Sequence, residues 1–242
     1  MLLPVVNVFD DHYEVTSDKK INPFRDNQIP LNIEEEKKKQ GKLIIDSHLD
    51  AAKHIVNKVI DNKLEAHIDR FLGNSEAYSK WLESMPKIFP LVLKNYQSSF
   101  PRYNKEELEL EMEKLNTTLS DGQYLFHGGQ WPNSKENEII LENSFSTSFC
   151  PQVALRNAEH RGKGYTQNHI DLFVLRTVQS DTKVFAYDQN KSDFGHEKEI
   201  LFAKGAKLKL IKRENITKNY TACNANNDKK NISVDVIAVD IT

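Results

Sequence analysis

Apolar residues recur with helical spacing over most of the segment 47–119. The first stripe follows Ser47, which has Asp50 in the capping-box position, and Gly73 supplies a stop after it. The apolar members of this stripe are Leu49, Ala52, Val56, Val59, Ile60, Leu64, Ile68 and Phe71. The pattern predicts one amphipathic helix over residues 47–73.

Two further helical segments are predicted before residue 120. The apolar positions of the first are Tyr78, Trp81, Leu82, Met85, Phe89 and Val92. Pro86 and Pro90 must break or kink this segment, because proline has no amide hydrogen for the interior of a helix. The second segment begins near Asn104, with Glu107 in the capping-box position. Its apolar side is formed by Leu108, Met112, Leu115 and Leu119.

From Gln123 onward the hydrophobic period changes to two, which predicts strands. The expected strands are Gln123–His127, Phe145–Phe149, Ile170–Thr177, Lys183–Tyr187, Glu197–Ala203, Ala206–Arg213 and Ser233–Ile241. Helices are expected at Lys135–Glu142 and Gln152–His160, and the polar tract 218–230 is expected to be a loop. Because few helices separate the later strands, we expect an antiparallel or mixed sheet and an α+β fold.

The change of pattern divides the chain into two predicted parts near residue 120. Residues 1–120 are expected to form an N-terminal arm and a helical subdomain, and residues 121–242 a β-rich core. Within the first part, the segment 1–40 has two proline-containing stretches and the charged run 34–39. This composition predicts a loosely attached arm.

The composition is that of a globular protein, with 38% hydrophobic residues among 242 and a formal net charge of −2. The near-neutral charge argues against a nucleic-acid binder held mainly by phosphate neutralisation. No run approaches the roughly 18 apolar residues of a membrane span, and Met1–Phe9 lacks signal-peptide features. Cys150 and Cys223 are too few for a disulfide scaffold or a zinc site, although one bridge stays open. We expect a cytoplasmic protein, or one delivered into a target-cell cytosol.

The first motif of chemical interest is the segment 124–129, in which an apolar strand leads through His127 into Gly128 and Gly129. Glycine allows a ligand to approach the backbone closely, so that a planar amide could hydrogen-bond there, and imidazole can donate to a ribose hydroxyl. On its own, a histidine before a Gly-Gly turn is more often structural.

The second motif is the segment 145–149, with the sequence Phe-Ser-Thr-Ser-Phe. Strand alternation predicts that Ser146 and Ser148 face one side and that Thr147 faces the other with the phenylalanines. Alone, this motif is better explained by an ordinary strand with hydroxyl groups on its solvent face.

The third motif is the segment 195–202, in which Glu197 and Glu199 are predicted to lie on the same side of one strand. Two carboxylates held close together repel, so the pKa of at least one of them should be raised. This is costly in a strand that enters an apolar run, and it suggests a functional pair. The alternative is an exposed edge strand on which Lys198 acts as a gatekeeper against aggregation.

In this order and spacing, the three motifs resemble the catalytic core of the ADP-ribosyltransferase superfamily. The resemblance covers Gln123–Arg213 and is strongest to the branch with aromatic-Arg-Gly, S-T-S and E-x-E strands. It implies a core of two facing sheets, with NAD as co-substrate in the cleft between them and with no metal. Residues 1–120 resemble only the helical N-terminal region that is common in bacterial toxin-like members.

The resemblance also implies roles for individual residues. Glu199 matches the glutamate that bonds a ribose hydroxyl of NAD, and a carboxylate there would stabilise the oxocarbenium-like transition state. Glu197 matches the glutamate that positions an arginine acceptor. Ser146 matches a catalytic serine that holds the second glutamate and the ribose, and Thr147 and Ser148 would support NAD binding.

Phe194 precedes the E-x-E strand, where the family often places an aromatic residue that touches the acceptor.

His127 stands where the E-x-E branch has arginine. In the branch that includes diphtheria toxin and the poly-ADP-ribose polymerases, histidine occupies this place and bonds the ribose, and Gly128 resembles the residue that holds the nicotinamide amide. A neutral imidazole cannot serve as a permanent phosphate clamp. Arg156 is therefore the predicted partner of the pyrophosphate, with Arg161 and Lys163 behind it.

These features predict an NAD-dependent mono-ADP-ribosyltransferase of the toxin or effector type, which releases nicotinamide and transfers ADP-ribose to a macromolecule. Protein arginine is the leading acceptor. Nucleic acid is an alternative acceptor, because the segment 191–230 has 10 basic and 5 acidic residues. A catalytically inactive NAD-binding module is the alternative from a different class. A neutralising antitoxin or immunity protein is a further expected partner, and no membrane partner is expected.

Overall fold

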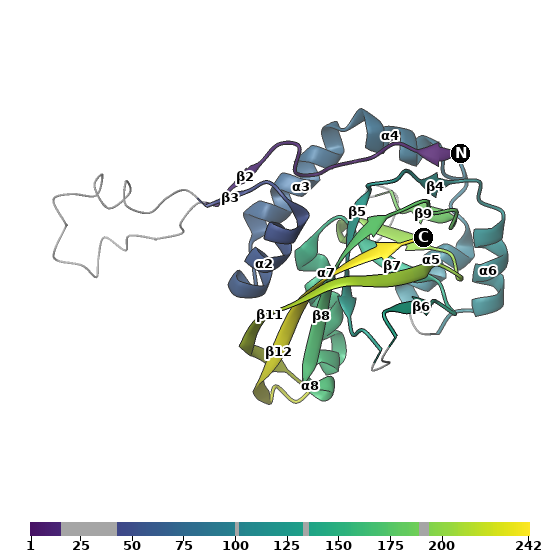
Figure 1. The fold of residues 1–242 in the computed structure, drawn as a ribbon. Helices are drawn as coiled ribbons and strands as arrows, with labels where there is room; N and C mark the ends of the chain where they lie inside the picture. Colours follow the sequence, from purple (N-terminus) through teal and green to yellow (C-terminus); the bar gives the residue numbers. More distant parts are fainter. Residues whose placement is uncertain (16–42, 100–101, 133–135, 189–193) are drawn as a thin grey trace.

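The computed structural model describes residues 1–15, 43–99, 102–132, 136–188 and 194–242 (Figure 1). Its helices are α2 (His48–Lys58), α3 (Asn62–Asn74), α4 (Glu76–Glu83), α5 (Leu91–Ser99), α6 (Lys105–Glu113), α7 (Pro151–Glu159) and α8 (Lys163–Gln167), with 3₁₀ turns η1 (His160–Gly162) and η2 (Gly195–Glu197). Its strands are β1 (Leu2–Leu3), β2 (Tyr13–Glu14), β3 (Ile44–Ile45), β4 (Thr118–Leu119), β5 (Tyr124–Gly129), β6 (Glu138–Ile140), β7 (Phe145–Ser148), β8 (His169–Thr177), β9 (Val184–Ala186), β10 (Glu199–Phe202), β11 (Lys207–Cys223) and β12 (Lys229–Ile241).

A mixed sheet of eight strands forms the centre of the molecule, in the order β6-β11-β12-β8-β5-β7-β10-β9. Strands β12 and β8 run parallel, and the other neighbouring strands of this sheet are antiparallel. The expected α+β class and mixed sheet are therefore confirmed. The paired residues between β5 and β7 are Phe126 and Ser148 alone. The two expected facing sheets are thus two halves of one sheet that are joined at this pair.

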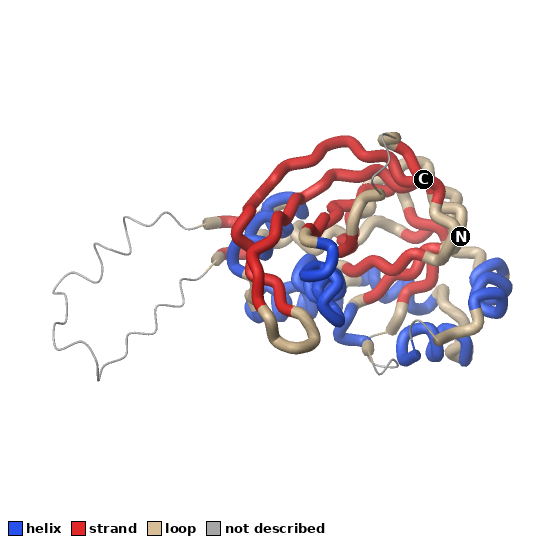
Figure 2. The backbone as a smooth tube through the Cα atoms, turned by 90° about the horizontal axis from the view of Figure 1, so that it is seen from below, coloured by secondary structure: helices blue, strands red, loops and turns tan. Residues whose placement is uncertain are grey.

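The helices pack mainly on the two halves of the sheet in separate groups. Helix α2 lies against β8, β11 and β12, and α7 lies against β5, β7 and β8. Helices α5 and α6 form a second core with the other half, through Leu93, Leu108, Phe185, Tyr187 and Leu201. In Figure 2 the long strands β11 and β12 arch over one side of the molecule, and most of the helices lie on the other side.

The main hydrophobic core extends across residue 120, which was the predicted boundary between the two parts of the chain. Ile55 and Leu64 of the helical part belong to the same buried cluster as Phe126 and Val234 of the sheet. The helical part is thus packed directly against the sheet that carries the three motifs. The division into two domains stays a prediction.

The predicted single helix over residues 47–73 is wrong, because the chain forms two helices, α2 and α3, that are separated near Val59. Val59 has a φ of 67°, a conformation that cannot continue a right-handed helix. The side chain of Asp61 accepts a hydrogen bond from the amide of Leu64 and thereby begins α3. The buried Asp61 carboxylate also accepts from the hydroxyl of Tyr13 at 3.1 Å, so a distant segment supports the break.

The other two predicted segments do form helices, but α6 ends at Glu113, and Leu119, which was predicted on its apolar side, lies in β4 instead. Helices α4 and α5 are separated around Pro86 and Pro90, as the prolines require. Helix α6 begins after Asn104, whose side chain accepts a hydrogen bond from the amide of Glu107 at 3.1 Å.

Residues 1–15 are not a loosely attached arm. Strand β1 pairs in parallel with β4, and Leu3, Val6 and Val8 are buried in the main core. The indole of Trp81 donates to the carbonyl of Pro4 at 2.7 Å. Buried apolar side chains therefore hold this segment in place, whereas the charged run 34–39 lies outside the described residues.

Two predictions about the second half of the chain are also wrong. The predicted helix Lys135–Glu142 contains strand β6 instead, which pairs with β11 and bears an ion pair of 2.8 Å between Glu138 and Lys209; Lys135 lies outside the described residues. The polar tract 218–230 is largely the tip of the β11–β12 hairpin, not a loop. Tyr220 and Ala222 are buried there and supply the period of two that the polar neighbours obscure.

The two cysteines form no bridge, since Cys150 is buried, Cys223 is exposed and both are free. None of the helices in the described part of the chain is long and apolar enough to cross a membrane.

The side chain of His48 is buried against aromatic rings near the start of α2. Its ring stacks on Tyr124 at a centroid distance of 4.7 Å and meets Phe9 edge-on at 5.0 Å. Burial lowers the pKa of His48 to about 3, because the imidazolium would lose its hydration. His48 is therefore neutral in the folded protein. In an unfolded chain, a histidine takes up a proton at about pH 6.5.

We predict that acid destabilises the fold through His48. Below about pH 6.5 the unfolded chain binds a proton that folded His48 does not, so stability that is present above this pH is lost, by up to about 1.4 kcal/mol per pH unit. Urea unfolding at about pH 7 and about pH 5 should show a smaller loss for His48→Phe than for wild type. The exposed control His12→Phe should keep the wild-type loss, and equal losses in all three proteins would contradict the prediction.

Candidate active site

Glu199 is the first residue of β10, and its carboxyl group is buried, with 4% of the residue exposed. Its Oε2 accepts a hydrogen bond of 2.7 Å from Nε2 of Gln97 on α5, and the carboxyl group also bonds the hydroxyl of Ser146 on β7. Burial raises the pKa of Glu199 to about 7; the two hydrogen bonds oppose this rise and the negative charge of Glu197 adds to it. A carboxyl group in this state is poised to change charge near neutral pH.

The alternation predicted that Glu197 and Glu199 share one strand. This is wrong, because Glu197 lies in the 3₁₀ turn η2. Lys198 follows with a φ of 51°, and this left-handed residue re-directs the chain between the two glutamates. The two carboxyl groups still interact, because Glu197 raises the pKa of Glu199. Partial burial raises the pKa of Glu197, and the charges of His196 and Arg156 oppose the rise. The predicted like-charge pair is therefore present, but on a turn and a strand.

Lys198 is not an exposed gatekeeper, because only 1% of it is exposed. Its Nζ lies 2.9 Å from Oδ1 of Asp69 and 3.4 Å from Oε1 of Glu65, both on α3, and donates to the carbonyl of His196 at 2.8 Å. A buried ammonium must be paired in this way. The residue between the two glutamates thus ties their turn to the helical part of the chain.

The three hydroxyl groups of the S-T-S strand all contribute to the junction of β7 with the glutamate segment. Ser146 bonds Glu199, as described above. Thr147 donates to the carbonyl of Ile200 at 2.8 Å, and Ser148 donates to the carbonyl of Glu197 at 2.6 Å. Thr147 and Ser148 therefore brace the backbone around the glutamates, and their predicted contacts with NAD stay predictions.

His127 on β5 is connected to this junction through the backbone of Ser146. Its Nδ1 lies 2.7 Å from the carbonyl oxygen of Ser146, which can only accept, so Nδ1 carries the proton and Nε2 is an acceptor. Burial lowers the pKa of His127 to about 4, and its ring packs against Phe145 and Phe173 at 4.2 and 5.2 Å between centroids. The imidazole is thus neutral, and it would accept from a ribose hydroxyl at Nε2, not donate to it.

Gly128 lacks a side chain for a reason that its sequence context does not reveal. A Cβ atom at this position would lie 1.9 Å from the carbonyl oxygen of Ala154 on α7. The close packing of β5 against α7 therefore requires glycine here. Its predicted contact with the nicotinamide amide stays a prediction.

The predicted pyrophosphate cations lie in different surroundings. Arg156 on α7 is half exposed, and its Nη2 lies 3.1 Å from Oε1 of Glu65, so its charge is already balanced. Its charge also acts on Glu197, which places it near the glutamate turn. Lys163, at the start of α8, is exposed and its charge acts on His127. Arg161 is also exposed, with a φ of 57°.

Phe194 begins the turn that carries Glu197. Its carbonyl oxygen accepts a hydrogen bond of 2.9 Å from the amide of Glu197, and its ring lies 6.3 Å from that of His196. Phe194 is therefore close in the chain and in space to the predicted acceptor-binding glutamate, as expected for its position.

Three residues that the sequence analysis did not single out belong to this site: Gln97 on α5, and Glu65 and Asp69 on α3. They reach the glutamate segment from positions about a hundred residues or more away in the chain, with separations of 102 for Gln97 and 133 for Glu65. Neither spacing nor composition carries a signal for contacts of this range. Only the packing of the helical part against the sheet reveals them.

A separate cluster on the other half of the sheet contains His169, Asp171 and Asp235, whose ligand atoms lie within 4.8 Å of one another. The guanidinium of Arg213 contacts Asp171 and lies 2.8 Å from Oδ2 of Asp235. Arg213 therefore supplies the positive charge at the place that a metal ion would take.

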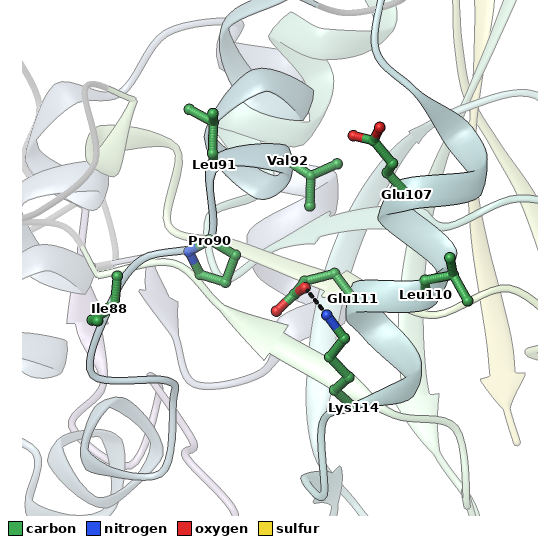
Figure 3. A pocket seen from close by; sticks show the side chains of 8 residues that line it. All are labelled: Ile88, Pro90, Leu91, Val92, Glu107, Leu110, Glu111 and Lys114. Carbon is green, nitrogen blue, oxygen red and sulfur yellow. Dashed lines mark hydrogen bonds and ion pairs between the residues drawn. The ribbon is translucent and has the colours of Figure 1, made fainter.

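A groove of about 480 Å³ lies between α5 and α6 (Figure 3), and its lining includes none of the predicted site residues. Its lining combines exposed aliphatic side chains with the ion pair of Glu111 and Lys114, which are 2.7 Å apart. The aliphatic residues that line it are Ile88, Leu91, Val92 and Leu110. The groove shares helix α5 with the glutamate site but none of its polar groups.

No protein-family model matches the chain, and no curated protein matches it. Among solved structures, it is similar to the ADP-ribosyltransferase Vis in complex with agmatine, with 12% identity, a TM-score of 0.45, and coverage of 76% of this chain and 86% of Vis. It is also similar to the enzymatic component C2-I of the C2-toxin from Clostridium botulinum, with 16% identity, a TM-score of 0.42, and coverage of 70% and 48%. It is similar as well to the ADP-ribosylating toxin BECa of C. perfringens with NADH. The identity is 13%, the TM-score is 0.40, and the match covers 82% of this chain and 51% of BECa.

Of these structures, Vis is named as an ADP-ribosyltransferase and BECa as an ADP-ribosylating toxin. The chain spans about half the length of the C2-I and BECa chains that it matches. What the residues of this site do is inferred from their own contacts and chemistry.

We predict that Gly128→Ala destabilises the fold, because the added methyl group collides with α7. The expected cost is about 1–3 kcal/mol, the usual range for overpacking. Gly73→Ala is the matched control: its added Cβ meets nothing within 4 Å, near the end of α3. It should leave stability unchanged or raise it by roughly 0.5–1 kcal/mol. Thermal unfolding of both variants tests this, and a Gly128→Ala protein as stable as Gly73→Ala would show that β5 and α7 are not in contact.

Proposed function

We propose that this protein is an NAD-dependent mono-ADP-ribosyltransferase, which cleaves the nicotinamide–ribose bond and transfers ADP-ribose to a macromolecular acceptor. The observation that carries the proposal is the buried carboxyl group of Glu199, held by Ser146 with Glu197 beside it. When the nicotinamide leaves, positive charge develops on the ribose. A preorganised carboxylate in a site shielded from water stabilises this charge more strongly than one in solution.

His127 and Glu199 act on the same ribose in this proposal. Ser146 supports the idea, because its carbonyl oxygen accepts from His127 while its hydroxyl group bonds Glu199. The neutral imidazole would accept a hydrogen bond from one ribose hydroxyl, and the carboxylate would take another. One residue of β7 would therefore set the spacing of both groups, which is the type of preorganisation that transition-state stabilisation needs.

The positively charged nicotinamide ring would itself favour the reactive form of Glu199. With a pKa of about 7, Glu199 is only partly ionised at neutral pH in the free protein. A nearby positive charge lowers the pKa of a carboxyl group. Binding of NAD would thus increase the fraction of ionised Glu199 in the complex.

The remaining NAD contacts are proposed for the backbone of Gly128, the neighbourhood of Thr147 and Ser148, and a cation for the pyrophosphate. Arg156 was the first candidate for this cation, but its pairing with Glu65 already balances its charge. Lys163, whose charge acts on His127, is the second candidate, and Arg156 acts in the same way on Glu197.

The acceptor is proposed to be arginine on a protein, bound by Glu197 and Phe194 in the turn η2. Partial burial and the raised pKa of Glu197 suit a group that binds a guanidinium and takes up its proton. This activity would make the protein a toxin or effector that acts in a cytosol, with a neutralising protein as a further partner.

Nucleic acid is less favoured as the acceptor. The basic residues of 191–230 that suggested it include Lys204, Lys209 and Lys212, which are paired with Glu109, Glu138 and Glu214. The charges of Lys204 and Lys209 are therefore balanced within the protein, and Lys212 shares Glu214 with Lys53.

We predict that Glu199→Gln abolishes nicotinamide release from NAD while the fold is retained. The amide keeps the shape of the carboxyl group but not its charge, and the loss of one such group typically lowers turnover by about 10²–10³-fold. Nicotinamide release in a folded protein, checked by circular dichroism, measures this. Wild-type turnover in Glu199→Gln would remove Glu199 from the mechanism.

Glu197→Gln should separate the two halves of the reaction. Because Glu197 serves the acceptor, transfer of labelled ADP-ribose to lysate should fall much further than hydrolysis of NAD by water. Protease should remove the label and nuclease should leave it. Equal losses of transfer and hydrolysis, or a label that only nuclease removes, would contradict a protein arginine acceptor.

A further inference from the structure

We propose that Gln97 on helix α5 is a positioning residue that orients the carboxyl group of Glu199 and favours its ionised form. The inference rests on the proposed function of Glu199, which it deepens. Gln97 belongs to none of the three motifs and lies in the helical part of the chain. Its amide Nε2 donates to Oε2 of Glu199 at 2.7 Å, the length of a hydrogen bond to a charged acceptor.

Helix α5 is fixed firmly enough to hold this amide in place. Leu93 and Tyr96 of α5 are buried in the second core together with Leu201 of β10 and Tyr187, which follows β9. The hydroxyl of Tyr187 donates to the carbonyl of Leu93 at 3.1 Å. Gln97 lies one turn beyond Leu93, so the packing of α5 sets the position from which its amide meets Glu199.

The groups around Glu199 explain why this donor matters. Glu197 from η2 adds a negative charge. Tyr96 on α5 and Tyr187, which follows β9, are buried phenols whose own pKa values are raised, so they stay neutral. The ammonium of Lys198 contacts Asp69 and Glu65 of α3. Gln97 and Ser146 are the donors that oppose the effect of burial on the pKa of Glu199.

A neutral donor has a particular advantage at this position. A cation in contact with Glu199 would stabilise the carboxylate but would also cancel the field that a positively charged ribose needs. The amide of Gln97 stabilises the ionised form and leaves its charge uncompensated. It also binds one carboxyl oxygen, Oε2, and thereby limits rotation of the group.

The test is the pH dependence of kcat/KM for nicotinamide release, which reports the pKa of essential groups in the free enzyme. Gln97→Leu keeps a similar volume and removes the donor. The midpoint of the activity rise should move upward by about one pH unit, as expected for the loss of one hydrogen bond to a charged group, and activity should recover at high pH. Asn95→Leu, exposed on the same helix, is the matched control and should keep the wild-type midpoint.

A uniform loss of activity in Gln97→Leu with an unchanged midpoint would overturn the proposal, because only the packing of α5 would then depend on Gln97. A second readout does not require enzymatic activity. Gln97→Leu should lower the free energy of unfolding more at about pH 8, where Glu199 is ionised, than at about pH 5, where it is protonated. If the wild-type protein releases no nicotinamide, the proposed function fails. The role of Gln97 is then decided by the unfolding free energies alone, and an equal loss of stability at both pH values would contradict that role.

Discussion

The burial of one carboxyl group, that of Glu199, is the constraint on which the arrangement of this site depends. An ionised carboxylate is costly away from water unless hydrogen bonds compensate for its lost hydration. Here β7 provides a hydroxyl group through Ser146, and α5 provides an amide through Gln97. The compensation is partial, which leaves the pKa of Glu199 at about 7, so that the carboxyl group changes charge near neutral pH.

Polar contacts beside the glutamates also join the helical part of the chain to the sheet. Glu65 of α3 contacts both Lys198 beside the glutamates and Arg156 on α7, and it accepts from Gln152 at 2.7 Å. Loss of the helical part would therefore expose Glu199 and leave the buried ammonium of Lys198 without its two carboxylate partners, Glu65 and Asp69. Residues before 120 therefore supply contacts that hold the glutamate segment in place.

Local patterns predicted much of the fold, and contacts between distant residues account for the errors. The cap at Asn104, the prolines after α4 and the S-T-S strand depend on neighbours within a few residues, so the sequence carries their signal directly. The break before α3 depends on Asp61 and its contact with Tyr13, and the burial of Lys198 depends on α3. The identities of the two glutamates were visible in the E-x-E pattern, but the turn that separates them follows from the left-handed conformation of Lys198.

The titration of Glu199 itself tests this account most directly. Its side-chain carboxyl carbon can be followed by ¹³C NMR as the pH is raised, with Glu199→Gln to assign the signal. The account predicts a midpoint of about 7, because burial outweighs the hydrogen bonds from Ser146 and Gln97. A midpoint near that of a solvated glutamate, about 4.3, would contradict it, since the carboxyl group would then lie in water and not beneath α5.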